Sequence, residues 1–586
     1  MRAAQVVRRR NKCYHRRAKT IRRVVDSAPK VVEEDNTQEP TPGTNAEDVD
    51  GGMRILGLWS PREPLSALPL GRDKMVWRKL CQIYLKHVDP IIKLIHRPSL
   101  SKWMQGGQYL GYPDSHPSIA ALRSSIAYSA AYSLTESQCQ TMFNMTKPTV
   151  VADCRQACEA ALGASGLLST NDITVLQAFV MYLASRRAQE RNRAVWTLIA
   201  VAVRIARAIC LQPDSEQRTG RRDSFFNQQM RKRTWYAVCL LDLQASFGQS
   251  SEPLIGPDEA ATSLSLPAHV NDADFDPGTN HQVPNREELT NMTFALVTYQ
   301  ALPSGRLINS TVQEENGTGD ASTKRPDSPS QLHHLRRFED QVFLLLRFCD
   351  PESSPYAWFT WHNTQCFVAA VRLSALRPLQ PAHAINQTLP SSSRLENHKE
   401  MMRLTLTVLE KARLMHTDPR GEDFRWCVNI PWHALAVAFA ECYVCEDVAV
   451  VRRVWPLVEA AYERHRKSTS LCDQGEIQSR LEELMRRTRD RLAPLLQDVS
   501  VASSSPNDNS ISALGSEVAT ATVDGSLSSQ FQEEAWNPTP DSLDQPNFQG
   551  DMTDPYWRVW DEFVSGISLD DFGSPSTVLH DNSFAG

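Results

Sequence analysis

The chain has 586 residues, of which 41% are hydrophobic, and its formal net charge is −5 at pH 7. This composition supports a sizeable core, in one large domain with tails or in a few smaller domains. No stretch of about 20 residues is apolar enough for a membrane span, and the N-terminus lacks the apolar segment of a secretory signal. We therefore expect neither a membrane protein nor a secreted one, and we expect the 13 cysteines to be reduced, buried thiols.

The first segment, residues 1–25, is a strongly basic arm that we expect to be disordered. Its first 23 residues include ten Arg or Lys and no acidic residue. The basic residues of interest are Arg8, Arg9, Arg10, Lys12, Arg16, Arg17 and Lys19. Such a run is typical of a nuclear localisation signal or of a patch that contacts DNA phosphates. Mitochondrial targeting is disfavoured because the dense arginine runs make a poor amphipathic helix.

A linker and a long helical part follow the arm. Residues 26–74 are rich in Pro, Gly and acidic side chains, which is typical of a linker. From about residue 75 to 497, apolar residues recur at helical spacing, and this pattern predicts one large all-α domain. Residues 304–330 are polar and are expected to form a disordered insert, because structureless loops of this length are uncommon inside compact domains.

The first half of the helical part contains two features with a specific expected role. The initial helical pattern is broken by Pro90 and ends at His96, just before Pro98. A metal or a general base is conceivable at His96, but no second ligand or acid lies at a useful spacing. We therefore expect this imidazole to hydrogen-bond the turn before Pro98. Further along, Asn171 or Asp172 is expected to cap the helix that starts at about residue 173.

Two cysteine pairs have a spacing that metals or redox chemistry can use. Cys154 and Cys158 share one helix face, and Cys442 and Cys445 form a CxxC late in an apolar helix. Neither pair is matched by a second Cys or His pair at zinc-site spacing. A redox CxxC would lie at a helix N-terminus beside a βαβ unit, which this chain lacks. Buried thiols are the favoured interpretation of both pairs.

Two helices are predicted at the centre of the chain, and the rest of the helical domain is expected to pack around them. Residues 194–212 are apolar on nearly every side, which predicts a helix buried within the domain and ended by Pro213. Residues 228–247 predict a second helix that ends near Gly248. Its apolar face consists of Trp235, Val238, Cys239, Asp242, Leu243 and Ser246. The Asp-rich stretch at 263–278 lacks calcium-loop spacing and is expected to be a loop that caps the next helix, over residues 287–304.

Taken together, these segments resemble the homology domain of fungal-specific transcription factors, the regulatory domain of zinc-cluster activators. The matching positions are His96 to Ser99; Val175, Gln177, Ala178 and Leu183; Trp196, Ala202, Arg204, Ala206 and Leu211; Arg231, Arg233, Trp235, Tyr236 and Asp242; Leu266, Pro267, Asn271, Asp272 and Asp274; and Trp426 with Ile430 to Ala436. One departure is Gly248-Gln249-Ser250, where the family usually has Gly-Arg-Pro. The resemblance implies an all-helical regulatory domain in a nuclear protein.

The resemblance also raises the question of zinc. In the family, a cluster of six cysteines in two C-x2-C-x6-C runs binds two zinc ions before the linker. Residues 8–13 resemble the stretch that leads to the third cysteine, so Cys13 is the one match to a ligand. The first two ligand positions hold Ala3 and Val6, and the next cysteine is Cys81. We therefore predict no zinc cluster and no cofactor in this chain, unless the true N-terminus lies upstream; loss of the cluster and truncation both stay open.

The tail, residues 498–586, is predicted to be disordered and Ser-rich, with an acidic and aromatic segment over residues 533–572. The segment carries Trp557, Trp560, Val564 and Ile567 at spacings of i, i+3, i+7 and i+10. These four side chains would share one face if the segment folds as a helix on a partner. We predict an activation segment that binds coactivators; the alternative is that this helix docks on its own domain.

The chain shows no phosphate-binding Gly-rich loop, no nucleophile elbow and no zinc-protease motif, so we predict that it is not an enzyme. The arm, linker, helical domain and acidic tail together predict a nuclear regulator of RNA polymerase II genes, in a secondary-metabolite or nutrient pathway. We expect it to bind DNA directly or through a partner, to recruit coactivators, to form homodimers or heterodimers, and to bind no membrane. Two alternatives stay open. One is a regulator without its own DNA-binding module that acts through a partner factor; the other is a non-nuclear helical protein that binds or converts a small molecule.

Overall fold

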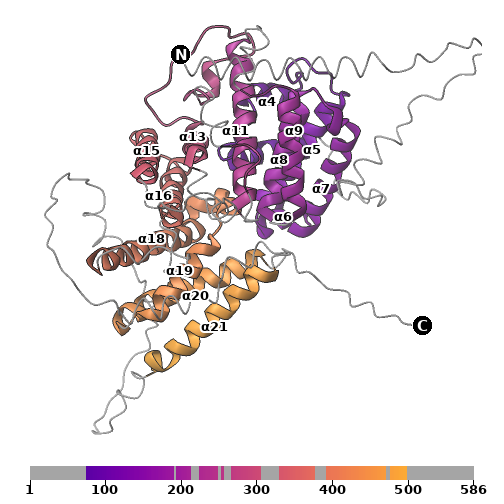
Figure 1. Ribbon diagram of the computed structural model, residues 1–586. Coiled ribbons are helices and arrows are strands. Elements are labelled where there is room, and N and C mark those ends of the chain that lie inside the picture. The colour runs from indigo at the N-terminus through magenta and orange to yellow at the C-terminus, as the bar shows by residue number, and fades with distance from the viewer. Residues whose placement is uncertain are drawn as a thin grey trace, which may run out of the picture. The chain divides into compact units, whose positions relative to one another are not determined.

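The computed structural model describes residues 74–189, 193–212, 223–247, 252–256, 266–304, 329–375, 391–445, 447–469 and 475–497. Within these ranges the secondary structure is helical, with one isolated bridge between Tyr109 and Tyr112 and no strand (Figure 1). The prediction of an all-α fold is confirmed. The basic arm with Cys13, the linker up to residue 73 and the acidic tail with Trp557 all lie outside the described residues.

The first group of helices surrounds one hydrophobic core. Its elements are α3 (Lys74–Ile83), the π-helix η1 (Tyr84–Val88), α4 (Arg97–Met104), α5 (Pro117–Ser133), α6 (Glu136–Phe143), α7 (Lys147–Ala164), η2 (Leu167–Ser169), α8 (Ile173–Gln189), α9 (Arg193–Ala208) and α11 (Phe225–Phe247). Helix α5 is central, since it packs against α3, α7 and α8. Its Ala- and Ser-rich sequence buries twelve of seventeen residues, and the small side chains let the neighbouring helices approach closely.

The two central helices form as expected. Helix α9 ends at Ala208, ahead of the predicted stop at Pro213, and packs against α8 and α11. The six residues of the predicted apolar face of α11 are all buried. The predicted cap of α8 is also confirmed, because the Asp172 carboxylate accepts a hydrogen bond from the backbone N–H of Thr174 at 2.8 Å.

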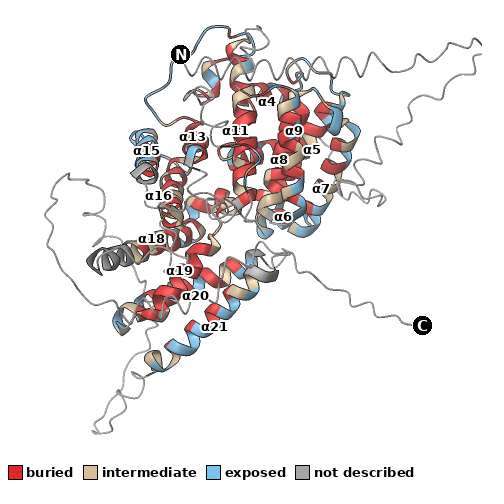
Figure 2. Cartoon of the chain, viewed as in Figure 1, coloured by how far each residue is buried: buried red, intermediate tan, exposed pale blue. Residues whose placement is uncertain are grey.

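The second group of helices surrounds another core. Three short elements precede it: η3 (Asp272–Asp274) packs against α4, and α13 (Thr293–Tyr299) and η4 (Leu302–Ser304) contribute residues to the first core. The elements of the second group are α15 (Pro329–Leu346), α16 (Pro355–Ala375), α18 (Ser391–Thr417), η6 (Pro419–Cys427), α19 (Trp432–Val444), α20 (Val448–Thr469) and α21 (Gly475–Gln497). The core is formed by α16, α18, α19, α20 and α21. Helix α19 is buried nearly throughout, whereas α21 is buried along one side and exposed along the other (Figure 2).

The segment η6 joins the two cores. The indole N–H of Trp426 donates to the backbone carbonyl of His87 at 3.2 Å, and its ring meets Tyr132 edge-on. Asp423 pairs with Lys86 at 2.8 Å and with the His87 ring at 3.0 Å. These contacts bind the second core to η1 and α5 of the first.

The helix expected over residues 287–304 is shorter than predicted. Helix α13 begins only at Thr293, because side chains engage the backbone N–H groups ahead of it. The N–H of Thr290 donates to the Thr293 hydroxyl at 2.9 Å, and the N–H of Asn291 donates to Asn271 at 3.0 Å.

The described helices can be compared with the length and apolar character that a membrane span requires. No single helix there is long and apolar enough to cross a bilayer, and only η6 and α19 taken together, bent by 110°, pass on length and composition.

Candidate functional site

An ion-pair network lies in the first core, where three distant segments of the chain meet. Asp272 of η3 accepts a hydrogen bond from Lys93 Nζ at 2.7 Å and lies 2.7 Å from Arg233 Nη2 of α11. Lys93 also donates to Asp89 at 2.8 Å. All four side chains are at most 1% exposed. Two buried carboxylates therefore compensate two buried cations, as burial of charge requires.

Arg97 extends this network to the surface. Its Nε donates to Asp89 at 2.5 Å, its Nη2 donates to the carbonyl of Leu85 at 3.2 Å, and its backbone N–H donates to Asp272 at 2.8 Å. A third of the Arg97 side chain is exposed, so water solvates part of this fifth charge. The network thereby connects the end of η1, the start of α4 and η3.

His96 completes the packing of the same region. Its Nε2 lies 2.9 Å from the carbonyl oxygen of Asp272 and 3.1 Å from that of Phe275. Carbonyl oxygens only accept, so Nε2 carries the proton, and Nδ1 accepts from the Ser99 hydroxyl at 2.8 Å. Both ring nitrogens are engaged, as expected for a histidine that hydrogen-bonds the turn. Burial lowers the pKa of His96 and favours the neutral ring.

The electrostatics of the network are set by burial and by close opposite charges. Burial disfavours the charge of Asp272, but Arg233 and Lys93 outweigh this effect and hold the pKa of its carboxyl far below the ordinary range. Burial lowers the pKa of Lys93, although Asp272 and Asp89 oppose the shift. Because the oxygens of Asp272 face Lys93, Arg97 and Arg233, this carboxylate is a structural group, and none of its contacts positions it to act as a base.

The network explains why the motifs of the sequence occur together. Residues 96–99, the basic start of α11 and residues 266–274 each contribute to it, and the Arg233 guanidinium also lies 5.5 Å from the centre of the Phe275 ring. Sequence analysis missed Asp89 and Lys93. Their signal was an opposite charge pair at i, i+4 inside an otherwise apolar stretch.

The stretch at residues 263–278, predicted to be a loop that caps the next helix, supplies one such contact, because the Asn271 side chain accepts from the N–H of Asn291 ahead of α13 at 3.0 Å. Only part of the stretch is described, and Asp272 differs from that prediction: it is buried in the network and accepts from the backbone N–H of Arg97, the first residue of the distant helix α4. The local turn is closed by Asp274, which accepts from the N–H of Asn271 at 2.8 Å and pairs with Arg286. The buried cations Lys93 and Arg233, which no local pattern brings near Asp272, account for the difference.

Comparison with known proteins identifies the chain. Residues 81–365 match the family described as fungal specific transcription factor domain. The protein is 44% identical over 583 residues to the C6 finger domain transcription factor adaR of Aspergillus niger, an alignment that covers 91% of this chain and 73% of that relative. The chain belongs to the fungal zinc-cluster transcription factor family.

Other members of this zinc-cluster family are equally similar. The C6 finger domain transcription factor nscR of Aspergillus fumigatus is 48% identical over 478 residues, which cover 80% of this chain and 59% of that relative. The nscR factor of Trichophyton verrucosum is 43% identical over 544 residues, which cover 92% of this chain and 78% of that relative. The chain thus spans between 59% and 78% of the length of these three relatives. No solved structure matches it.

The C6 finger in the relatives' names implies zinc, which the cysteines of this chain do not fit. A binuclear cluster needs six thiolates, whereas the residues before Cys81 contain Cys13 alone. In the described part of the chain no group of three or more His, Cys, Asp or Glu is placed to hold a metal ion.

The cysteine pairs behave as buried thiols. Cys154 and Cys158 are both buried, and the Cys158 sulfur lies 3.2 Å from the Ser125 hydroxyl. Burial raises the pKa of Cys158 and of Cys442 to about 12, which keeps these thiols protonated and unreactive. Cys445 differs from the prediction in being only half-buried, because it lies at the C-terminal cap of α19.

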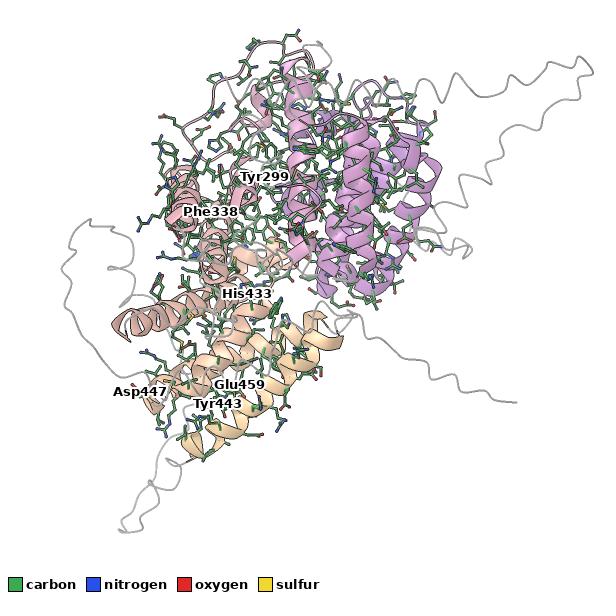
Figure 3. The ribbon with its side chains drawn as sticks, viewed as in Figure 1. Tyr299, Phe338, His433, Tyr443, Asp447 and Glu459 are labelled. Carbon is green, nitrogen blue, oxygen red and sulfur yellow. The ribbon has the colours of Figure 1, made fainter. Side chains whose placement is uncertain are left out.

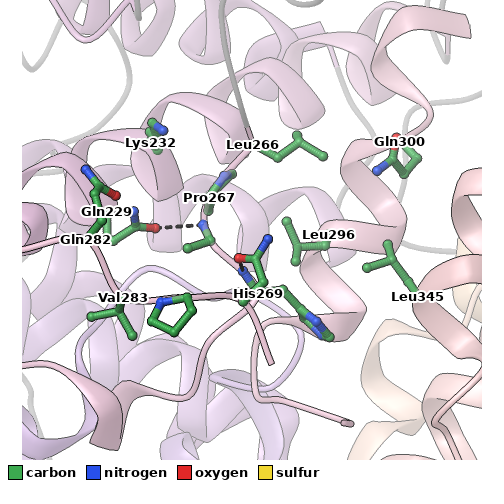
Figure 4. Close-up of a pocket in the computed structure, with 13 residues that line it drawn as sticks. Gln229, Lys232, Leu266, Pro267, His269, Gln282, Val283, Leu296, Gln300 and Leu345 are labelled. Carbon is green, nitrogen blue, oxygen red and sulfur yellow. Dashed lines mark hydrogen bonds between the residues drawn. The ribbon is translucent and has the colours of Figure 1, made fainter. Parts of the chain in front are cut away.

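A hollow of about 470 Å³ lies beside α11, α13 and α15 (Figure 4). Its lining includes Gln229, Pro267, His269, Leu296 and Leu345. Two of its polar members are engaged by the protein: Gln229 accepts from the N–H of Ala268 at 2.8 Å, and His269 lies between the Arg286 carbonyl and the Thr293 hydroxyl.

Proposed function

We propose that this protein regulates transcription of RNA polymerase II genes in the nucleus, in a secondary-metabolite or nutrient pathway, with residues 75–497 as its regulatory domain. The observation that carries the proposal is the 44% identity, over 91% of the chain, to a factor named for its C6 finger domain. The buried ion-pair network around Asp272 stabilises the fold and contains no catalytic pair. This favours a regulatory protein over an enzyme.

The basic arm is the proposed contact with DNA phosphates and the nuclear import signal. Its ten cations without an acidic residue would neutralise phosphates without selecting bases. Affinity should then fall steeply between 50 and 200 mM salt, as counterion release demands. A salt-independent, sequence-selective interaction of the full chain would refute this role of the arm.

A second candidate is a regulator that reaches its promoters through a partner factor, either as a homodimer or as a heterodimer. The observation that bears on it is the cysteine content: the residues before Cys81 contain Cys13 alone, whereas a binuclear cluster needs six thiolates. Chromatin immunoprecipitation of the tagged full chain, before and after depletion of co-purifying transcription factors, tests this candidate. Promoter occupancy that persists in their absence would exclude it.

The acidic and aromatic segment, residues 533–572, is the proposed contact with coactivators. Its aromatic face would enter a partner groove while flanking acidic residues keep it solvated beforehand. The direct test tethers the full chain to a reporter promoter through a heterologous DNA-binding domain. Replacing Trp557 and Trp560 with Ala should abolish most activation, whereas Phe531→Ala, outside the segment, should not. No activation by the unaltered chain would overturn this role of the segment.

A further inference from the structure

The hollow beside α11, α13 and α15 has the size of a site for a small molecule. Its volume of about 470 Å³ falls within the range of roughly 300–1,000 Å³ that is typical of such sites. The loops before and after η3 both line it. The Arg286 N–H donates to the carbonyl of His269 at 2.9 Å and joins these loops, while the N–H of Ala268 donates to Gln229 of α11 at 2.8 Å. The loop side of the hollow is therefore held in place by hydrogen bonds.

The helices on the other side are held by packing. Tyr299 of α13 stacks on Tyr236 of α11 with the ring centres 5.4 Å apart. Helix α13 also packs against α15, and Figure 3 labels Tyr299 and Phe338 on these two helices. Leu296 of α13 and Leu345 of α15 line the hollow and give it an apolar wall.

Gln229 supplies hydrogen-bond donors to the hollow. Its side-chain oxygen accepts from the Ala268 N–H, so the rest of the amide is an NH₂ group with two donors. This group donates to no residue that the structure describes. Because Gln229 is only 2% exposed and lines the hollow, a partner for these donors has to enter the hollow. An oxygen atom of a ligand would satisfy them.

The charge of the lining disfavours cations. Among the described residues that line the hollow none is acidic, and Lys232 brings a positive charge. His269 is a neutral member, since its Nδ1 donates to the Arg286 carbonyl at 3.0 Å and its Nε2 accepts from the Thr293 hydroxyl at 2.8 Å. Burial also lowers the pKa of His269. The lining therefore suits a neutral or an anionic molecule.

We propose that this hollow binds a small apolar molecule that carries a carboxylate or carbonyl oxygen. The apolar body lies against Leu296 and Leu345, and the oxygen accepts from the Gln229 amide. The charge of Lys232 favours a carboxylate over a neutral carbonyl. The proposal does not rest on the proposed function, because the site requires neither the basic arm nor the acidic tail.

Naphthoate is a suitable probe, because it combines two fused apolar rings with one carboxylate. Equilibrium dialysis against the full chain, without DNA, measures binding through the naphthalene absorbance of the protein-free chamber. We expect one bound molecule per chain, with a dissociation constant of about 0.1 mM for a ligand of this size. Naphthylmethylammonium, which has the same rings and the opposite charge, should bind at least about tenfold more weakly.

Two neighbouring residues of α15 show whether the hollow is the site. Leu345→Trp places a larger side chain in the lining and should weaken naphthoate binding at least about tenfold. Leu344→Trp makes the same change at a side chain that is 52% exposed and outside the lining, and it should leave binding unchanged. Equal binding by these two variants would overturn the assignment, as would a folded full chain that binds no naphthoate.

Gln229→Glu tests the donor separately. Glutamate keeps an oxygen for the Ala268 N–H but replaces the NH₂ group with a carboxylate. Naphthoate should then bind at least about tenfold more weakly and naphthylmethylammonium more tightly, whereas a purely structural role of Gln229 would weaken both probes alike and overturn the proposed donor. This reversal is measurable even if Leu345→Trp does not fold, which circular dichroism establishes. The DNA and reporter experiments above test the proposed function independently of these probes.

Discussion

Arg233 and Asp272 form an ion pair of 2.7 Å in which neither side chain is more than 1% exposed. The two residues come from α11 and η3, and Lys93 from a third segment binds the same carboxylate. A pair of this kind adds little net stability over an apolar replacement, yet removal of one partner is costly. The arrangement therefore makes the relative position of three segments depend on a single carboxylate.

Arg233→Met should destabilise the protein by about 3–5 kcal/mol, because it leaves a buried carboxylate short of a cation. Urea denaturation followed by circular dichroism measures the loss. The matched control is Arg286→Met, which removes an exposed partner of Asp274 and should cost at most about 1 kcal/mol. Equal losses in both variants would contradict the structural role of the buried network.

Acid should weaken the fold through Asp272. The pKa of this carboxyl is held far below its ordinary value in the folded chain, so the unfolded chain binds the extra proton as the pH falls. The stability that Asp272 contributes is present above its unfolded pKa of about 4 and is lost progressively below it. The free energy of unfolding, measured from pH 7 to 3, should fall less steeply for Asp272→Asn. An unchanged slope would show that other carboxyl groups dominate.

Gly421→Ala should destabilise η6 by about 1–3 kcal/mol, as overpacking does. An added Cβ would collide with the backbone carbonyl of Met415 and approach the Trp358 ring to 3.3 Å. Thermal unfolding measures the effect. Gly256→Ala is the control, since nothing lies within 4 Å of its added Cβ, and a comparable loss there would refute the steric explanation.

Trp426→Ala should uncouple the two cores, because it removes both the hydrogen bond to the His87 carbonyl and the contact with Tyr132. We expect the single calorimetric unfolding transition of the native chain to broaden or divide in two. Trp426→Phe keeps an aromatic ring and loses only the N–H donor, so it should cost about 1 kcal/mol and keep one transition. Undiminished cooperativity of Trp426→Ala would show that other contacts join the cores.

Local pattern predicted the elements of this fold better than it predicted their contacts. The apolar face of α11 and the cap at Asp172 follow from spacing and side-chain chemistry within a few residues, and both formed as expected. The role of Asp272 did not follow, because its partners Lys93 and Arg233 lie far away along the chain. A loop aspartate looks solvent-exposed until the fold brings cations to it.

In the candidate site, too, local features were predictable and contacts between distant residues were not. That His96 is a hydrogen-bonding residue was predictable from the absence of a second ligand nearby, whereas its bonds to the carbonyls of Asp272 and Phe275 were not. The roles predicted for Arg8 to Lys19 and for Trp557 to Ile567 fall outside the described residues and stay predictions.

The link through η6 bears on where this domain can be cut. The family match ends at residue 365, inside α16, which continues to Ala375. A fragment ending there would keep the first core but would lack α18 and η6, which cover the Trp358 side of α16. It would also expose the surface of η1 and α5 on which Trp426 lies. Apolar surface of that extent favours aggregation. A shortened protein for crystallisation should therefore run from Lys74 to Gln497.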